Sequence, residues 1–183
     1  MKLLLPVSLV VIVTLVITAL SLSPSPLTEK PDVSIEEQTE NKYLSFQALN
    51  SKKLENDDLE LFQTLKNNIQ ISNQVMNELD FLLNEYATSD SLDGAMEAME
   101  IAYEESVVLV RDIQTRFDPN DPTLLELKER YTTIMTHYIE GLSNQLTAIE
   151  SGDIEKMNHS LNVAKQSKQE ILLLVSVLEK KSN

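Results

Sequence analysis

The two histidines, His137 and His159, are the side chains of this chain best suited to bind a transition metal or to transfer protons near neutral pH. The apolar pattern described below predicts that they lie on neighbouring helices, so a two-histidine metal site is conceivable if they meet. A di-iron helical bundle, however, requires Glu-x-x-His on two helices, and the residues three positions earlier are Ile134 and Lys156. We therefore interpret both as ordinary surface or core-edge histidines, with metal binding as the alternative, and expect no cofactor.

Two further patterns resemble parts of metal sites. Met96 and Met99 form a Met-x-x-Met that offers thioethers to Cu(I), but both also fit the apolar pattern of a helix, which favours packing. A second stretch has part of the spacing of a calcium loop, with Gly at the sixth position and Glu at the twelfth. Its residues are Ser89, Ser91, Asp93, Gly94 and Glu100. Because the first ligand position holds Ser89 instead of Asp, a helix start capped by Asp90 or Ser91 is the simpler interpretation.

Four carboxylates at helical spacing define what we call the acidic stripe: Asp93, Glu97, Glu100 and Glu104. Steps of three and four residues place them on one face of a helix, and no Lys or Arg follows in that helix before Arg111. Like charges one turn apart cost up to a few tenths of a kcal/mol per pair. The stripe is either a solvated face or a docking surface for a basic partner or cell-surface cation.

The composition argues against several classes of protein. With 15 Lys plus Arg and 29 Asp plus Glu, the formal charge is 15 − 29 = −14, which opposes nucleic-acid binding. The chain has no cysteine and therefore no disulfide or thiolate nucleophile. Its three glycines stand far apart, whereas a phosphate-binding loop needs several together. No Gly-x-Ser-x-Gly is present, and we expect no enzyme.

The amino terminus has the pattern of a membrane signal. Residues 3–28 carry no charge, and residues 3–22 are predominantly apolar. A helix of this length spans about 30 Å, the thickness of the hydrocarbon core of a bilayer. Lys2 supplies the preceding side-chain charge, which predicts a cytoplasmic amino terminus and an exported domain. The alternatives are an uncleaved single-pass anchor in the cell membrane and a signal peptide cleaved before Leu22, with a secreted product.

A stalk follows the membrane signal. Residues 23–33 contain three prolines, which favour an extended linker, and we assign residues 23–56 to a stalk that is at most partly ordered. Within it, Leu44, Phe46 and Leu49 have the spacing to hold a short helix against the domain. Because an exported domain without disulfides suits a compartment that does not depend on oxidative folding, a bacterial origin is expected.

Four apolar patterns of helical period fill residues 57–183, and they predict helices at about 57–86, 90–117, 121–151 and 153–181. Lys168 interrupts the last pattern, so its amine either extends to the rim or pairs with a buried carboxylate. Short connections force long helices to run antiparallel to their neighbours. The predicted fold is all-α, an antiparallel up-down-up-down four-helix bundle, preceded by the transmembrane or signal helix and the linker.

Residue types at the ends of these patterns predict how the helices begin and end. Asp57 with Glu60 is expected to cap the first helix. Asp121 is expected to cap the third helix, with Pro122 at its first helical position. Gly152 is expected to close the third helix in the left-handed conformation, and Asp153 to cap the fourth.

Small residues make the beginning of the second helix slim, namely Gly94, Ala95, Ala98 and Ala102. They permit either close approach of a neighbouring helix or a small gap in which a ligand binds. Together these patterns predict a non-enzymatic interaction or structural module, held at the membrane by its first helix and open to a basic protein or cell-surface partner. The alternative is an extracytoplasmic accessory domain that binds or senses a small molecule or metal ion.

Overall fold

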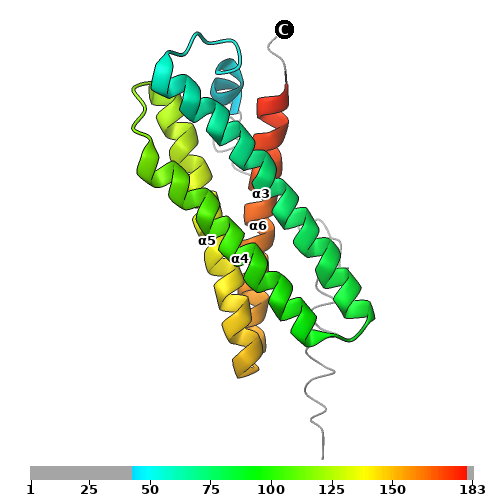
Figure 1. Ribbon diagram of the computed structural model, residues 1–183. Helices are drawn as coiled ribbons and strands as arrows, with labels where there is room; N and C mark the ends of the chain where they lie inside the picture. Colours follow the sequence, from blue (N-terminus) through cyan, green and yellow to red (C-terminus); the bar gives the residue numbers. More distant parts are fainter. Residues whose placement is uncertain (1–42, 181–183) are drawn as a thin grey trace, which may run out of the picture.

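The computed structural model describes residues 43–180, and this part of the chain is all-helical. A short helical segment covers residues 43–48 and is followed by four long helices (Figure 1). These are α3 (Asn56–Thr88), α4 (Leu92–Arg116), α5 (Pro122–Ser151) and α6 (Ile154–Glu179). The predicted membrane segment, residues 1–22, and the linker at 23–33 lie outside the described residues. Within residues 43–180, no helix combines the length and apolar character needed to cross a bilayer.

All five helical segments pack together. Each long helix packs against the next one in the chain, and α3 also packs against α6. The α3–α4 and α5–α6 turns lie at one end of the molecule, whereas the α4–α5 connection and the 43–48 segment lie at the other (Figure 1). Near the two turns, the α3–α4 hairpin splays away from the α5–α6 hairpin. Within residues 43–180, the end of α3 and the start of α4 therefore lie apart from the α5–α6 turn.

The core consists of the apolar side chains whose spacing predicted the helices. Each helix contributes residues at alternating steps of three and four, because these steps return to the same face. Burial of one such side chain is worth roughly 1.5 to 3 kcal/mol, which favours packing of all four helices. Fully buried members include Leu65, Ile69, Met76, Ile113, Leu127, Met135, Ile171 and Leu174.

The capping predictions are confirmed for three helix ends and wrong for one. Asp153 accepts a hydrogen bond from the Lys156 N–H at the start of α6, and Gly152 ends α5 with φ of 70°. Asp121 caps α5, as described below. Asp57 does not cap α3: it lies inside that helix, whose N-cap residue, Glu55, makes no side-chain cap hydrogen bond.

Residues 89–100 form a capped helix start, the simpler of the two interpretations of their sequence. Asp90 is left-handed, with φ of 55°, and Ser91 is extended and accepts a hydrogen bond from the Gly94 N–H. The helix begins at Leu92, later than expected, because Ser91 and not Asp90 is its cap. Residues 92–100 are helical and therefore do not form a calcium-binding loop.

Residues 43–54 pack against the core formed by the long helices, so the packed part of the described chain begins before the predicted domain boundary at residue 57. Phe46 and Leu49 are buried in the core, as their spacing predicted, whereas Leu44 is exposed. Asn50 fixes the segment to two helices. Its side-chain N–H donates to the Leu178 carbonyl at 3.1 Å, and its oxygen accepts from Lys66 Nζ at 2.9 Å.

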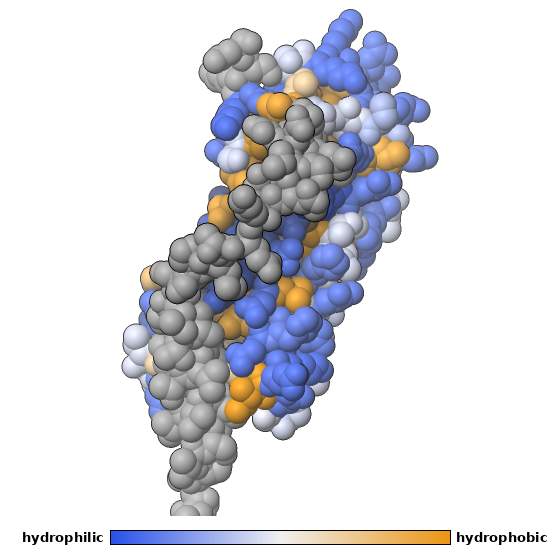
Figure 2. All heavy atoms as spheres, turned by 180° about the vertical axis from the view of Figure 1, so that it is seen from behind, coloured by the Kyte–Doolittle hydropathy of each residue, from blue (hydrophilic) through white to orange (hydrophobic). Residues whose placement is uncertain are grey.

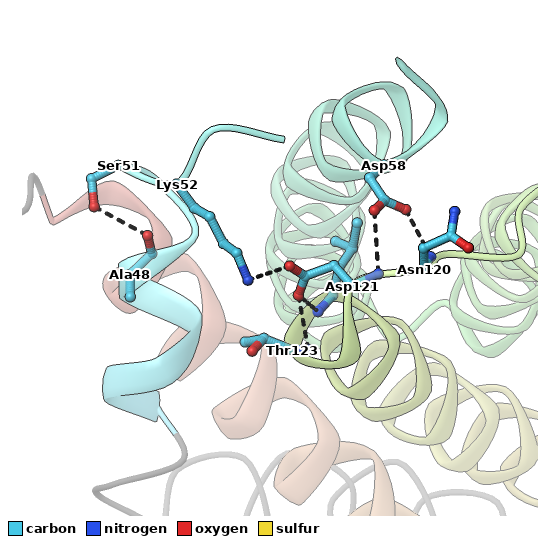
Figure 3. Close-up of polar contacts among 8 residues, drawn as sticks. Ala48, Ser51, Lys52, Asp58, Asn120, Asp121 and Thr123 are labelled. Atoms are coloured by element: carbon cyan, nitrogen blue, oxygen red, sulfur yellow. Dashed lines mark hydrogen bonds and ion pairs between the residues drawn. The ribbon is translucent and has the colours of Figure 1, made fainter. Parts of the chain in front are cut away.

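The connection between α4 and α5 is held by two carboxylates (Figure 3). Asp121 Oδ1 accepts hydrogen bonds from the N–H groups of Thr123 at 2.9 Å and Leu124 at 3.1 Å, and its other oxygen pairs with Lys52. Desolvation by burial tends to raise the pKa of Asp121. The hydrogen bonds and the charge of Lys52 outweigh that effect and hold the pKa below its ordinary value of 3.8.

The second carboxylate, Asp58, belongs to α3 and reaches across to the same connection. Its two oxygens accept hydrogen bonds from the backbone N–H groups of Asn120 at 3.0 Å and Asp121 at 3.2 Å. The start of α3 is therefore tied to the start of α5, since these N–H groups precede the helix and lack an intrahelical partner.

Candidate functional site

The α3–α4 hairpin is strongly acidic over residues 67–110, a range that we call the acidic hairpin. These 44 residues contain nine carboxylates and no Lys, Arg or His. The nine are Glu78, Asp80, Glu85, Asp90, Asp93, Glu97, Glu100, Glu104 and Glu105. Lys66 and Arg111 are the first cations on either side of the range along the chain. The splay seen in Figure 1 separates the end of this hairpin from the α5–α6 turn.

One of the nine carboxylates has a cationic partner on α6. Lys168 Nζ pairs with Asp80 and lies 3.4 Å from the Met76 carbonyl oxygen. The Asp80 side chain is half exposed, so Lys168 directs its amine to the rim and not to a buried carboxylate. On the α5 side, burial and then the charge of Asp80 raise the pKa of the Tyr138 phenol.

The acidic stripe lies on the solvent-facing side of α4. All four side chains, Asp93, Glu97, Glu100 and Glu104, are exposed, and among the described residues none of them forms an ion pair. Their uncompensated charges produce a negative potential that attracts cations and basic surfaces. The role of the stripe in docking remains a prediction.

A groove lies between α3 and α4, beside two of the small residues for which the sequence left open either close helix approach or a gap. Its volume is about 130 Å³, and the small side chains of Ala98 and Ala102 leave this space open. Its lining combines apolar side chains with one carboxylate from each helix. The lining residues are Val75, Glu78, Leu79, Leu82, Ala98, Ile101, Ala102 and Glu105. This cavity is what we call the α3–α4 groove.

Large apolar side chains are exposed close to the groove. Ile101 lines it and is 52% exposed, and Val108, seven residues later on α4, is 53% exposed. Because seven residues are nearly two helical turns, Val108 lies on the same face as Ile101. Phe81 is 67% exposed one turn beyond Glu78 on α3. Apolar and acidic side chains therefore alternate along this side of the hairpin.

The charges of α5 and α6 differ from those of the acidic hairpin. Figure 2 shows the view from behind, where the described surface is mainly hydrophilic with separate hydrophobic spots. Both signs of charge occur on α5 and α6. On these helices Arg130 pairs with Glu170, and Lys128, Lys156 and Lys165 add positive charge. Net negative charge is therefore concentrated on the α3–α4 hairpin.

The two histidines considered as metal ligands lie on neighbouring helices of the described part of the chain. His137 on α5 and His159 on α6 are both exposed. No group of three or more His, Asp or Glu side chains among residues 43–180 is arranged to hold a metal ion. Met99 is buried and Met96 packs against the core, which confirms the packing interpretation of that pair.

Of the two carboxylates at the groove, sequence reasoning missed Glu78 and counted Glu105 only among the charges of the second helix, outside the acidic stripe. It followed the charges of one helix at a time, and Glu78 belongs to the helix before the acidic stripe. A count of charges across both helices of the hairpin, from Lys66 to Arg111, is the signal that finds them. The comparison with known proteins adds no relative: no family model, curated protein or solved structure matches the chain.

Proposed function

We propose that this chain is a non-enzymatic interaction module that binds a basic partner through its acidic hairpin. In this proposal the four long helices form an antiparallel up-down-up-down bundle outside the cell membrane. The amino-terminal apolar segment holds the bundle there, or leaves it secreted if the segment is cleaved. The proposal rests on one observation, the nine carboxylates without a cation in residues 67–110.

Electrostatics supports this use of the hairpin. A surface of one charge sign accelerates encounter with a partner of the opposite sign and orients it, and the effect weakens with salt. Repulsion among the stripe carboxylates costs stability, and a basic partner relieves that cost. A basic protein, or a cationic polymer of the cell surface, has the required chemistry.

The test compares two variants of the full-length chain with equal changes of charge. One variant neutralises the acidic stripe by Asp93→Asn, Glu97→Gln, Glu100→Gln and Glu104→Gln. The control neutralises four exposed carboxylates of α5 and α6 by Glu129→Gln, Glu140→Gln, Glu150→Gln and Glu155→Gln. The probe is a fluorescently labelled lysine oligomer, with the protein in nanodiscs of zwitterionic lipid and empty nanodiscs as the reference.

We expect the stripe variant to bind the oligomer about tenfold more weakly than the control variant at low salt, because four exposed ion pairs contribute roughly 0.2 to 1 kcal/mol each. The difference should shrink as salt is added. Equal affinities of the two variants would mean that the oligomer responds to total charge alone, and the acidic hairpin would lose its assigned role.

Small-molecule binding is the second candidate function, and the α3–α4 groove is the observation relevant to it. Its volume of about 130 Å³ lies below the roughly 300 Å³ at which ordinary ligand pockets begin. The groove therefore suits a single side chain better than a whole metabolite. A thermal-shift survey with amino acids, peptides and metal ions tests this function, since a ligand that binds only the native state raises its melting temperature.

A further inference from the structure

The α3–α4 groove has the size of one aliphatic side chain. An apolar cavity of roughly 150 Å³ in a protein core accommodates a benzene molecule, and the groove measures about 130 Å³. Leu79, Leu82, Ala98 and Ala102 supply its apolar walls. A branched aliphatic side chain from another molecule fits this space and displaces water from it.

The carboxylates beside the groove indicate which residues of a partner lie next to the inserted aliphatic side chain. Glu78 and Glu105 line the groove from opposite helices, and neither forms an ion pair with a described residue. No cation occurs between Lys66 and Arg111 along the chain. A partner that buries an aliphatic side chain here must approach these carboxylates, and Lys or Arg beside that side chain makes the approach favourable.

The exposed apolar side chains indicate a helical partner. Ile101 and Val108 are seven residues apart on α4 and both more than half exposed, a separation of about 10 Å along the helix axis. Apolar side chains at positions i and i+7 of a second helix have the same separation. A helix that lies along α4 therefore contacts both side chains.

We propose that the α3–α4 groove is the docking site for a cationic amphipathic helix of another protein. The helix inserts one aliphatic side chain between Leu79 and Ala102, covers Ile101 and Val108, and places Lys or Arg against Glu78 and Glu105. This inference rests on the proposed function and adds to it the place and the class of partner. A second copy of this chain and a free small molecule are the other occupants that the test distinguishes.

The probe is a synthetic peptide of about 18 residues, five helical turns, made of Leu and Lys with leucine at positions i, i+3, i+4 and i+7. A scrambled peptide of the same composition has the same charge without the apolar face. Binding to the full-length chain in zwitterionic nanodiscs is followed by fluorescence anisotropy, with empty nanodiscs as the reference. We expect the amphipathic peptide to bind about tenfold more tightly than the scrambled one, beyond the difference measured on empty nanodiscs.

Three variants test the groove itself. Ile101→Gln should weaken binding of the amphipathic peptide about fivefold, because it removes apolar area from the contact. Leu172→Gln, at a similarly exposed position of α6, is its control and should have no effect. Ala98→Leu fills the groove and should remove the preference for the amphipathic peptide, with circular dichroism to check folding. If Ala98→Leu does not fold, Ile101→Gln and the charge variants still test whether the peptide binds at the groove.

The charge variants separate the groove from the general attraction of the acidic surface. Glu78→Gln with Glu105→Gln should weaken binding about fivefold, and Glu129→Gln with Glu140→Gln on α5, with the same change of charge, less than twofold. The groove proposal fails if both peptides bind equally, or if Ile101→Gln binds the amphipathic peptide as the unaltered chain does.

Three further outcomes identify which idea has failed. If the groove proposal fails but the stripe variant still loses affinity for the lysine oligomer, the proposed function stands without this docking site. Self-association that Ile101→Gln abolishes would assign the groove to a second copy of the chain. A thermal shift with a small apolar compound, abolished by Ala98→Leu, would assign it to a small ligand. Each of these two assignments overturns the partner proposed here.

Discussion

Asp121 offers the sharpest test of how the α4–α5 connection is held. In the variant Asp121→Ala, the N–H groups of Thr123 and Leu124 lose their acceptor, and loss of an N-cap costs about 1 kcal/mol, with a range of roughly 0.5 to 2. The ion pair with Lys52 is also lost. Because the Lys52 side chain is 47% exposed, we assign this pair at most about 1 kcal/mol. The expected loss of unfolding free energy is therefore about 2 kcal/mol.

The variant Asp121→Asn separates these two contributions. Asparagine caps helices about as well as aspartate, so only the charge pair is lost, at about 0.5 to 1 kcal/mol. For a domain of this size, 1 kcal/mol corresponds to about 2 to 4 °C in melting temperature. Asp121→Ala should thus melt about 4 to 8 °C lower than the unaltered chain, and Asp121→Asn about 2 °C lower. Asp118→Ala, an exposed acid of the same connection, is the control and should melt within about 1 °C.

The pH dependence gives an independent check. The folded pKa of Asp121 lies below its ordinary value of 3.8, so its carboxylate stabilises the fold above that pH. This contribution is lost as the pH falls from 3.8 through the folded pKa. Urea denaturation at a series of pH values should therefore show the gap between the unaltered chain and Asp121→Asn closing below pH 3.8. A gap that stays constant to lower pH, or an Asp121→Ala variant as stable as Asp118→Ala, would refute the assigned role.

Four further predictions concern contacts between the helices. Gly141→Ala should lower the unfolding free energy by about 1 kcal/mol in urea titrations. The added Cβ would lie 3.2 Å from the α6 backbone, and this overpacking outweighs the gain in helix propensity. A stabilised variant would contradict this. Tyr131→Phe removes the 3.0 Å hydrogen bond to the buried Ser72 hydroxyl and should lower the unfolding free energy by about 1 to 3 kcal/mol. Adding Ser72→Ala to this variant should restore most of the loss, because both partners of the hydrogen bond are then removed. If the effects of the two substitutions simply add in this double-mutant cycle, the two residues are not coupled. Burial raises the pKa of Tyr131 to about 12, whereas a tyrosine in the unfolded chain has a pKa near 10. The raised pKa stabilises the fold below a pH of about 10, so the free energy of unfolding should fall as the pH rises above that value. Ultraviolet titration that shows phenolate formation before unfolding would contradict this. Lys168→Met should cost less than about 1 kcal/mol by thermal denaturation, because its partner Asp80 is half exposed, and a larger loss would mean that the pair is effectively buried.

The helices were predictable because they depend on local periodicity. The spacing of residues such as Leu65, Ile69 and Met76 marks one face of a helix whatever the face packs against. The caps Asp121 and Asp153 were equally accessible, since a cap contacts backbone only two or three residues away. Asp57 was misplaced because a cap depends on where the backbone enters the helix, and α3 begins one residue earlier, at Asn56.

The candidate site was only half predictable. Small side chains at Ala98 and Ala102 permitted either close approach of a neighbouring helix or a gap beside α4, and the structure has the groove there. The identity of its other wall depends on the register between α3 and α4, which no local pattern specifies. Glu78 and Leu82 therefore emerged only from the structure. The pairing of Lys52 with Asp121 is of the same kind, since it joins residues far apart in the chain.

The most direct test of the central claim is a map of where a cationic amphipathic helix touches the protein. Carbodiimide joins a lysine amine to a carboxylate in direct contact with it, and mass spectrometry of the digested complex identifies the carboxylates. With the full-length chain and the Leu and Lys peptide, we expect cross-links concentrated on Glu78 and Glu105 of the α3–α4 hairpin. Cross-links spread evenly over all exposed carboxylates, with Glu129 and Glu140 of α5 labelled as strongly as Glu78 and Glu105, would contradict the claim that the hairpin is the interaction surface.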